Sequence, residues 1–325
     1  MKRSSLGLLL LSVSALPLTM CNDYDNELMP AGMVSSSDPT ADRLYAAACA
    51  FAAAGKTNAA ISKLKEIVTD HALSPIAPQA RLMLGDMYCR DEDYRQAFKE
   101  YDKVIAHYHS SPCYEQALNR ELELAMKAVK GEMKGQMLWG LWEVGMESSV
   151  VEEWLQNIVK NAPYNDMAAT ALSMLARYQL EVCRDPERAR ASYAQLAERY
   201  PDSSLAPAAQ LMTAQLWSQQ HTRGNNALVN LQKAQEAYEE FLLRYPNDRR
   251  AGEARRRVAE MRALLVDQEL EVGRYYLERA RSYSAAMQCF RSVIAQKSVN
   301  PTAAKEAAEL YRKAAALAEK GKATH

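Results

Sequence analysis

The amino-acid sequence predicts an all-α fold, a right-handed solenoid of about six helix pairs. Three observations lead to this prediction: one stretch has the pattern of a helical hairpin, a related pattern recurs along the chain, and an alanine-rich composition with only 4 Phe suits a fold without a large central core. A chain of 325 residues would otherwise form one large domain or two or three smaller ones. In a solenoid each repeat packs only on its neighbours, so chain length sets no such limit.

The stretch from Leu84 to Tyr108 has the pattern of two helices joined by a charged turn. Gly85 and Tyr88 lie on one face of the first helix, and a stripe of apolar residues at helical spacing defines the second, beginning at Ala97. Because Gly85 and Ala97 are small, the helices can approach closely, and we expect Tyr88 and Tyr101 to fill the space beside them. The Leu-Gly-x-x-Tyr and Ala-x-x-x-aromatic pattern resembles a tetratricopeptide repeat.

The pattern of the second helix recurs along the chain. It consists of a small or apolar residue, a large one four positions later, an apolar one seven later and often a proline twelve later, where the helix must stop. Six copies occur, and they start at Ala60, Ala97, Val151, Ala189, Ala234 and Ala286. The intervals of 37, 54, 38, 45 and 52 residues exceed the usual repeat of about 34, which predicts longer helices or loops.

The predicted organisation follows from these repeats and from the segments around them. From the N-terminus we expect a signal peptide at 1–20, a flexible tether at 21–40, N-terminal repeats at 41–164, C-terminal repeats at 165–299, and a capping helix with a tail at 300–325. An irregular insertion rich in Gly, Met and Trp, residues 131–148, interrupts the third repeat. The proline-free run 249–282 is expected to form two successive helices or one bent helix.

The N-terminus indicates export. Lys2 and Arg3 precede an apolar run at 6–18, which is too short to span a bilayer and typical of a signal-peptide core. The sequence Leu-Thr-Met-Cys that ends at Cys21 resembles a bacterial lipobox, whose cysteine becomes the lipidated first residue of the mature protein. We therefore predict lipidation at Cys21. Ordinary signal-peptidase cleavage is the alternative, since Met20 stands where the lipobox has a small residue.

Charge and motifs disfavour nucleic-acid binding and catalysis. Lys plus Arg and Asp plus Glu number 40 each, so no net charge attracts the chain to nucleic acid. The sequence has no Gly-Lys-Ser/Thr phosphate loop, no Gly-x-Ser-x-Gly elbow and no His-Glu-x-x-His pair. His107 and His109 would diverge on a helix and could not share a metal. We predict no enzymatic activity, no cofactor and no metal, and we interpret the five cysteines beyond Cys21 as structural thiols.

Three passages are more specific than the general repeat pattern. Tyr-Pro-Asp-Ser at 200–203 recurs as Tyr-Pro-Asn-Asp at 245–248, residues 268–294 place Glu-Val-x-x-Tyr-Tyr before an Ala-Ala-x-x-x-Phe helix, and residues 117–131 end a helix at glycine. Together with the export signal, these passages resemble the BamD family, the outer-membrane lipoproteins of the β-barrel assembly machinery. The resemblance covers residues 21–299.

The resemblance implies a function at the outer membrane. It implies a periplasmic scaffold, lipid-anchored in the inner leaflet of the outer membrane. Its C-terminal repeats would engage the periplasmic domains of a barrel subunit, and its N-terminal repeats would meet nascent outer-membrane proteins. The expected function is non-catalytic assistance to β-barrel folding and insertion. A periplasmic adaptor for cell-wall synthesis, cell division or polysaccharide export is the main alternative, and a hydrolase that uses the solenoid as a substrate platform is a more remote one.

Two kinds of candidate binding site follow from the repeat architecture. The first helix of each repeat is expected to line a concave groove suited to an extended peptide, and its candidate residues are Tyr45, Gln79, Leu82, Asp86, Cys89, Ser173 and Arg177. Candidate partner contacts are Trp139 and Trp142 in the insertion, and Arg274, Tyr275 and Glu278 in the late repeats. The alternatives are ordinary exposed residues, an insertion that packs on its own fold, and a solvated helix face.

Overall fold

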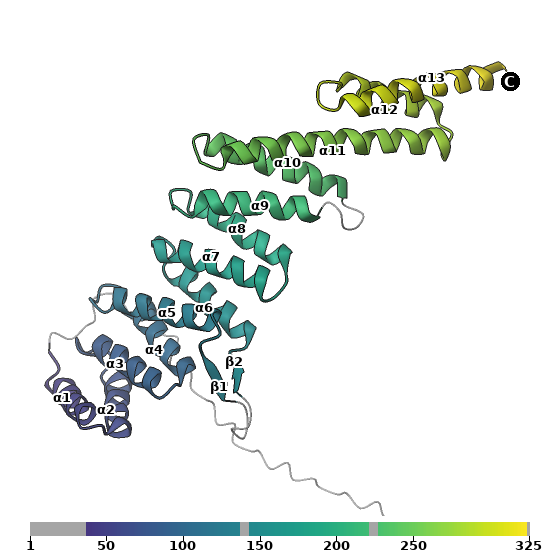
Figure 1. Cartoon of the computed structure of the whole chain (residues 1–325). Coiled ribbons are helices and arrows are strands. Elements are labelled where there is room, and N and C mark those ends of the chain that lie inside the picture. Colours follow the sequence, from purple (N-terminus) through teal and green to yellow (C-terminus); the bar gives the residue numbers. More distant parts are fainter. Residues whose placement is uncertain (1–36, 137–142, 221–226, 324–325) are drawn as a thin grey trace, which may run out of the picture.

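The computed structural model describes residues 37–136, 143–220 and 227–323. Within these ranges the chain forms thirteen helices and one short strand pair. Figure 1 shows the helices stacked one after another in an elongated array, with α1 at one end and α13 at the other. The prediction of an all-α solenoid of about six helix pairs is confirmed.

Successive helices pack as antiparallel neighbours, so that pairs form repeats. The first three pairs are α1 (Pro39–Ala53) with α2 (Thr57–Asp70), α3 (Ala77–Arg90) with α4 (Tyr94–His107), and α5 (Tyr114–Val129) with α6 (Ser148–Asn161). The next three are α7 (Asp166–Glu181) with α8 (Pro186–Arg199), α9 (Ala206–Gln220) with α10 (Ala227–Arg244), and α11 (Ala251–Glu278) with α12 (Tyr283–Ala295). The last helix, α13 (Pro301–Ala323), packs on α12 and also touches α11.

The proline-free run near the C-terminus forms one helix. Helix α11 is continuous over 28 residues, which makes it the longest helix in the described part of the chain. It is long enough to pack on α10 with its first half and on α12 with its second. Its length accounts for the long interval before the last repeat.

The insertion in the third repeat contains a strand pair in place of the irregular structure expected there. Strands β1 (Lys134–Gln136) and β2 (Glu143–Gly145) pair in antiparallel register, with Lys134 opposite Gly145. The pairing satisfies backbone groups that a short excursion between α5 and α6 would otherwise leave to water. Trp139 and Trp142 fall at 137–142, outside the described residues.

Each turn between repeats ends in the same backbone cap. A polar side chain accepts a hydrogen bond from the backbone N–H two residues later, at 2.8–3.4 Å, just before the next helix begins. The capping residues are Ser74, Ser111, Asn165, Ser203 and Asp248. They are separated by 37, 54, 38 and 45 residues, the same intervals as those of the second-helix pattern. The caps therefore keep one register along the array.

Close helix approach at glycine is the main packing device within two of the repeats. A Cβ atom added to Gly85 of α3 would lie 2.4 Å from Cε1 of Tyr101 on α4, and Tyr101 is fully buried. The same arrangement returns in the last pair, where a Cβ on Gly273 of α11 would lie 2.6 Å from Cε1 of the buried Phe290 on α12. The predicted packing of Tyr101 against Gly85 is confirmed, whereas Tyr88 is only partly buried.

Candidate partner-binding surfaces

The groove candidates are distributed over three first helices, with Leu82 and Cys89 on α3 and Ser173 on α7. Tyr45 lies on α1, Gln79 and Asp86 on α3, and Arg177 on α7. Tyr45 is half-buried, and burial raises the pKa of its hydroxyl, with a smaller contribution from Cys49 one turn later. The thiol of Cys49 lies 3.9 Å from the sulfur of Met83 on α3, so this end of α1 is joined to the next repeat.

Asp86 is held by two neighbouring helices. Its Oδ1 atom accepts a hydrogen bond from the hydroxyl of Tyr101 at 2.7 Å and pairs with Nε of Arg120 on α5 at 3.3 Å. The thiol of Cys89 lies 3.6 Å from the same hydroxyl. These contacts link the second repeat to the third, and about a third of the Asp86 side chain still reaches solvent. Asp86 is thus both a structural link and an exposed carboxylate.

Gln79 and Arg177 differ in burial and in their polar contacts. The Oε1 atom of Gln79 is buried and has no hydrogen-bond partner within the described residues, so an acceptor remains unused on α3. Arg177 is 70% exposed and pairs with Glu181 one turn later at 3.4 Å, a contact that water screens strongly. Among the groove candidates, Arg177 offers the most accessible charge.

Among the late-repeat candidates, one residue is held in ion pairs and the other two are exposed. The guanidinium of Arg274 pairs with Glu271 at 2.6 Å and with Glu306 on α13, so it ties the capping helix to α11. Tyr275 is 60% exposed, and its ring meets that of Tyr276 edge to face at 5.9 Å. Glu278 is exposed at the end of α11. Tyr275 and Glu278 are therefore the accessible members of this set.

A tryptophan clamp joins the fourth and fifth repeats and was not anticipated from the sequence. Trp217 of α9 has the guanidinium of Arg190 (α8) 3.6 Å from its ring centre and the ammonium of Lys233 (α10) 4.6 Å from it. Cation–π contacts contribute roughly 0.5–2 kcal/mol each. The clamp borders a polar hollow of about 360 Å³ between α8, α9 and α10. Its members come from three separate helices, so no local pattern indicates it.

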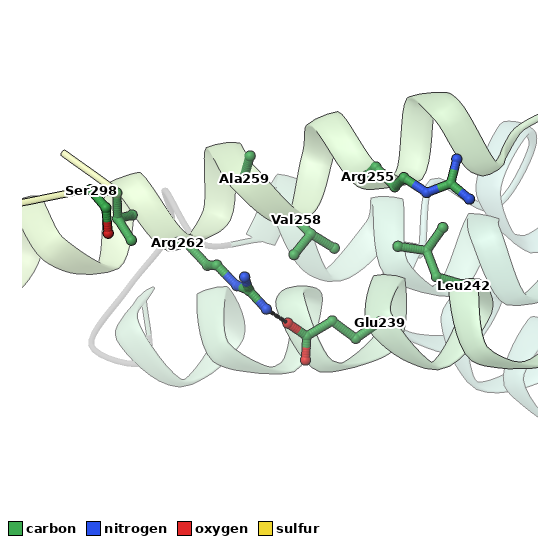
Figure 2. Close-up of a pocket in the computed structure, with 8 residues that line it drawn as sticks. Glu239, Leu242, Arg255, Val258, Ala259, Arg262 and Ser298 are labelled. Atoms are coloured by element: carbon green, nitrogen blue, oxygen red, sulfur yellow. Dashed lines mark hydrogen bonds and ion pairs between the residues drawn. The ribbon is translucent and has the colours of Figure 1, made fainter. Parts of the chain in front are cut away.

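A groove in the late repeats was also not anticipated. It lies between α10 and α11, has a volume of about 490 Å³ and is bounded at one end by Ser298 and Val299, in the turn before α13. Figure 2 shows Leu242 and Val258 pointing into the space between the helices, and Arg262 reaching across to Glu239. The sequence feature that indicates this groove is the pair Arg255 and Arg262, which lie seven residues apart on α11.

The described residues contain neither a metal-binding cluster nor a membrane-spanning helix. They contain no cluster of three or more His, Cys, Asp or Glu side chains that could hold a metal ion. No helix among them is both long enough and apolar enough to cross a bilayer. Cys21 precedes the described part of the chain.

Comparison with known proteins finds two family models that each match part of the chain. Residues 168–203, which span α7 and α8, match the tetratricopeptide repeat model. Residues 211–324, from α9 to the end of α13, match the YfiO family of outer membrane lipoproteins. The resemblance to the BamD family is confirmed over the last third of the chain. These matches indicate an adaptor of the outer-membrane lipoprotein type that acts through protein–protein contacts.

The other comparisons add little. No curated protein matches the sequence. A solved structure, titled "Functional Characterization of Pseudomonas Aeruginosa pilF", aligns with 82% of this chain and 95% of that one, at 14% identity and a TM-score of 0.28. That similarity is too low to support a conclusion. The YfiO match is the more informative one, because it contains the groove and the late-repeat candidates Arg274, Tyr275 and Glu278.

Proposed function

We propose that this chain is a non-catalytic scaffold that assists the folding and insertion of β-barrel proteins into the outer membrane. The match of residues 211–324 to an outer-membrane lipoprotein family carries this proposal. The repeat array supports it, because a solenoid presents extended surfaces to other proteins and requires no reaction centre. The partners would be a barrel-assembly subunit with periplasmic domains and nascent outer-membrane proteins.

The late repeats are the proposed contact for the barrel-assembly subunit. Tyr275 and Glu278 are exposed there, and tyrosine is frequent among residues that dominate binding energy. Arg274 would act indirectly, because its guanidinium already bridges α11 and α13. The proposed contact residues therefore lie on a surface whose shape depends on the capping helix.

The N-terminal groove is the proposed contact for nascent barrel proteins. A synthetic peptide with the alternating aromatic and polar residues of a barrel strand is a suitable probe. A photo-crosslinker at position 82 should capture this peptide, and Tyr45→Ala or Gln79→Ala should reduce the yield at least threefold. Glu309→Ala on α13 is the matched control and should leave the yield unchanged. Equal yields from all variants would remove the groove from the proposal. Asp86 is kept intact, because its loss would also disturb Tyr101 and Arg120.

A lipid on Cys21 is the proposed anchor at the periplasmic face of the outer membrane. Radiolabelled palmitate should be incorporated into the wild-type chain and not into Cys21→Ala, which should appear in the soluble periplasmic fraction. A single acyl chain binds membranes only weakly, so the full lipoprotein modification is needed for stable attachment. Equal labelling of the two proteins would place the lipid elsewhere, and no labelling of either would indicate ordinary signal-peptidase cleavage.

A further inference from the structure

The groove between α10 and α11 combines an apolar floor with a cationic end. Val258 of α11 is buried at its base, Leu242 of α10 is half-buried beside it, and Val299 at the far end is 37% exposed. All three line the groove, and Figure 2 shows Leu242 and Val258 pointing into it. Such a surface can bury further apolar side chains at a gain of roughly 25 cal/mol per Å² removed from water.

The two arginines of the groove are not equivalent. Arg262 pairs with Glu239 at 2.6 Å, so its charge is neutralised. This ion pair crosses the groove near its middle. Arg255 is exposed and makes no ion pair within the described part of the chain. Its neighbour Arg256 is likewise exposed. One end of the groove therefore carries positive charge that no ion pair with a residue of 227–323 neutralises.

We propose that this groove binds a helical segment of a partner protein that carries a carboxylate at one end of an apolar stripe. Arg255 would meet the carboxylate, and Val258 and Leu242 would meet apolar side chains one turn along. The neutral Arg262–Glu239 pair lies two turns from Arg255, about 10 Å away along α11. An amphipathic helix laid along two others is a common form of peptide recognition, with anchors at i, i+3, i+4 and i+7.

The same observations favour a protein over an anionic membrane surface. The positive charge lies at the end of a narrow apolar groove between two helices, and a flat lipid surface could not reach its floor. Glu253 is half-buried and Glu260 is exposed on α11, and Glu260 pairs with Arg257 at 3.0 Å, so the helix does not present a uniform basic face. This inference is independent of the barrel-assembly proposal, because it requires only a partner helix of the stated chemistry.

A designed peptide tests the inference directly. The probe is a fluorescein-labelled, alanine-based helical peptide with Glu at position i, Leu at i+3, i+4 and i+11, and Gln at i+7 where it would meet the Arg262–Glu239 pair. Fluorescence anisotropy with the full mature chain should give saturable binding that weakens as salt rises. Arg255→Glu should weaken it at least tenfold, and Val258→Asp should do the same by adding charge to the floor. Arg312→Glu on α13 is the control and should bind as the wild type does.

A charge exchange keeps the test independent of folding. A second peptide with Lys in place of Glu should bind Arg255→Glu better than it binds the wild type, which a merely unfolded variant could not do. The inference is overturned if no saturable binding occurs up to about 1 mM, a free energy of only about 4 kcal/mol. It is also overturned if both peptides bind the wild type equally, or if vesicles with 30% phosphatidylglycerol compete with the Glu peptide while neutral vesicles do not.

Discussion

Replacing Glu121 with Met is expected to stabilise the protein at neutral and alkaline pH. Glu121 lies on α5 with no exposed surface, and neither carboxyl oxygen has a hydrogen-bond partner within the described residues. A buried polar group without a partner costs roughly 1–3 kcal/mol. Methionine has a similar length and no polar group to satisfy. The free energy of unfolding at pH 8 should therefore rise by about 1–3 kcal/mol.

Glu121 also predicts how the stability of the fold changes with pH. Burial raises the pKa of Glu121 well above its ordinary value of 4.5, and the nearby carboxylate of Asp102 raises it further. Above pH 4.5 the unfolded chain releases this proton while the folded chain keeps it, so the folded state binds more protons. Stability should consequently fall as the pH rises from that value toward the raised pKa. Burial also raises the pKa of Asp102, so a smaller slope of the same sign should remain in the variant.

Urea denaturation at pH 5 and pH 8 measures both effects. The wild type should lose stability between the two values, and Glu121→Met should lose less. Glu123→Gln is the matched control, because Glu123 lies on the same helix, is 59% exposed and makes only a surface ion pair with Arg120. It should change stability by no more than about 0.5 kcal/mol at either pH. Equal pH slopes for Glu121→Met and the wild type would contradict the account of the buried carboxyl.

Gly273→Ala and Gly85→Ala are each expected to destabilise the fold. The new methyl group would lie 2.6 Å from a ring carbon of Phe290 in the first case and 2.4 Å from one of Tyr101 in the second. Both rings are fully buried, so they cannot swing aside without moving other core residues. Overpacking of this kind costs about 1–3 kcal/mol.

Gly252→Ala, on the same helix as Gly273, is expected not to destabilise the fold. Nothing lies within 4 Å of a Cβ at that position, and alanine is the better helix former by about 0.5–1 kcal/mol. Thermal unfolding followed by circular dichroism should place Gly252→Ala at or above the wild type and the other two variants below it. If all three substitutions shifted the midpoint alike, close helix approach at Gly85 and Gly273 would not be the packing device described above.

The repeat architecture could be predicted because its signals are local. The small and large residues of each second helix lie within one helix, and the start of α1 follows from Asp38, whose side chain accepts from the N–H groups of Thr40 and Ala41. The Tyr-Pro turns were recognised at 200 and 245, and the structure extends the same cap to Ser74, Ser111 and Asn165. Those caps share a spacing rather than a residue type, which is why the sequence motif captured only two of them.

The candidate surfaces were harder to predict because they join distant parts of the chain. Asp86 meets Arg120 from the next repeat, and Arg274 meets Glu306 from the capping helix. A helix pattern gives the face on which a residue lies, but not the side chain that reaches it from another repeat. The strands within the insertion are three residues each, too short for an alternating pattern to indicate them.

Affinity purification from gently solubilised envelopes tests the central claim most directly. The chain should be tagged at its C-terminus and expressed at its native level, with Tyr275→Ala combined with Glu278→Ala as the matched variant. A barrel-assembly role predicts that an outer-membrane barrel protein with periplasmic domains co-purifies with the wild type, and that its yield falls for the variant. Recovery of cell-wall synthases or polysaccharide-export proteins in its place would contradict the proposed function.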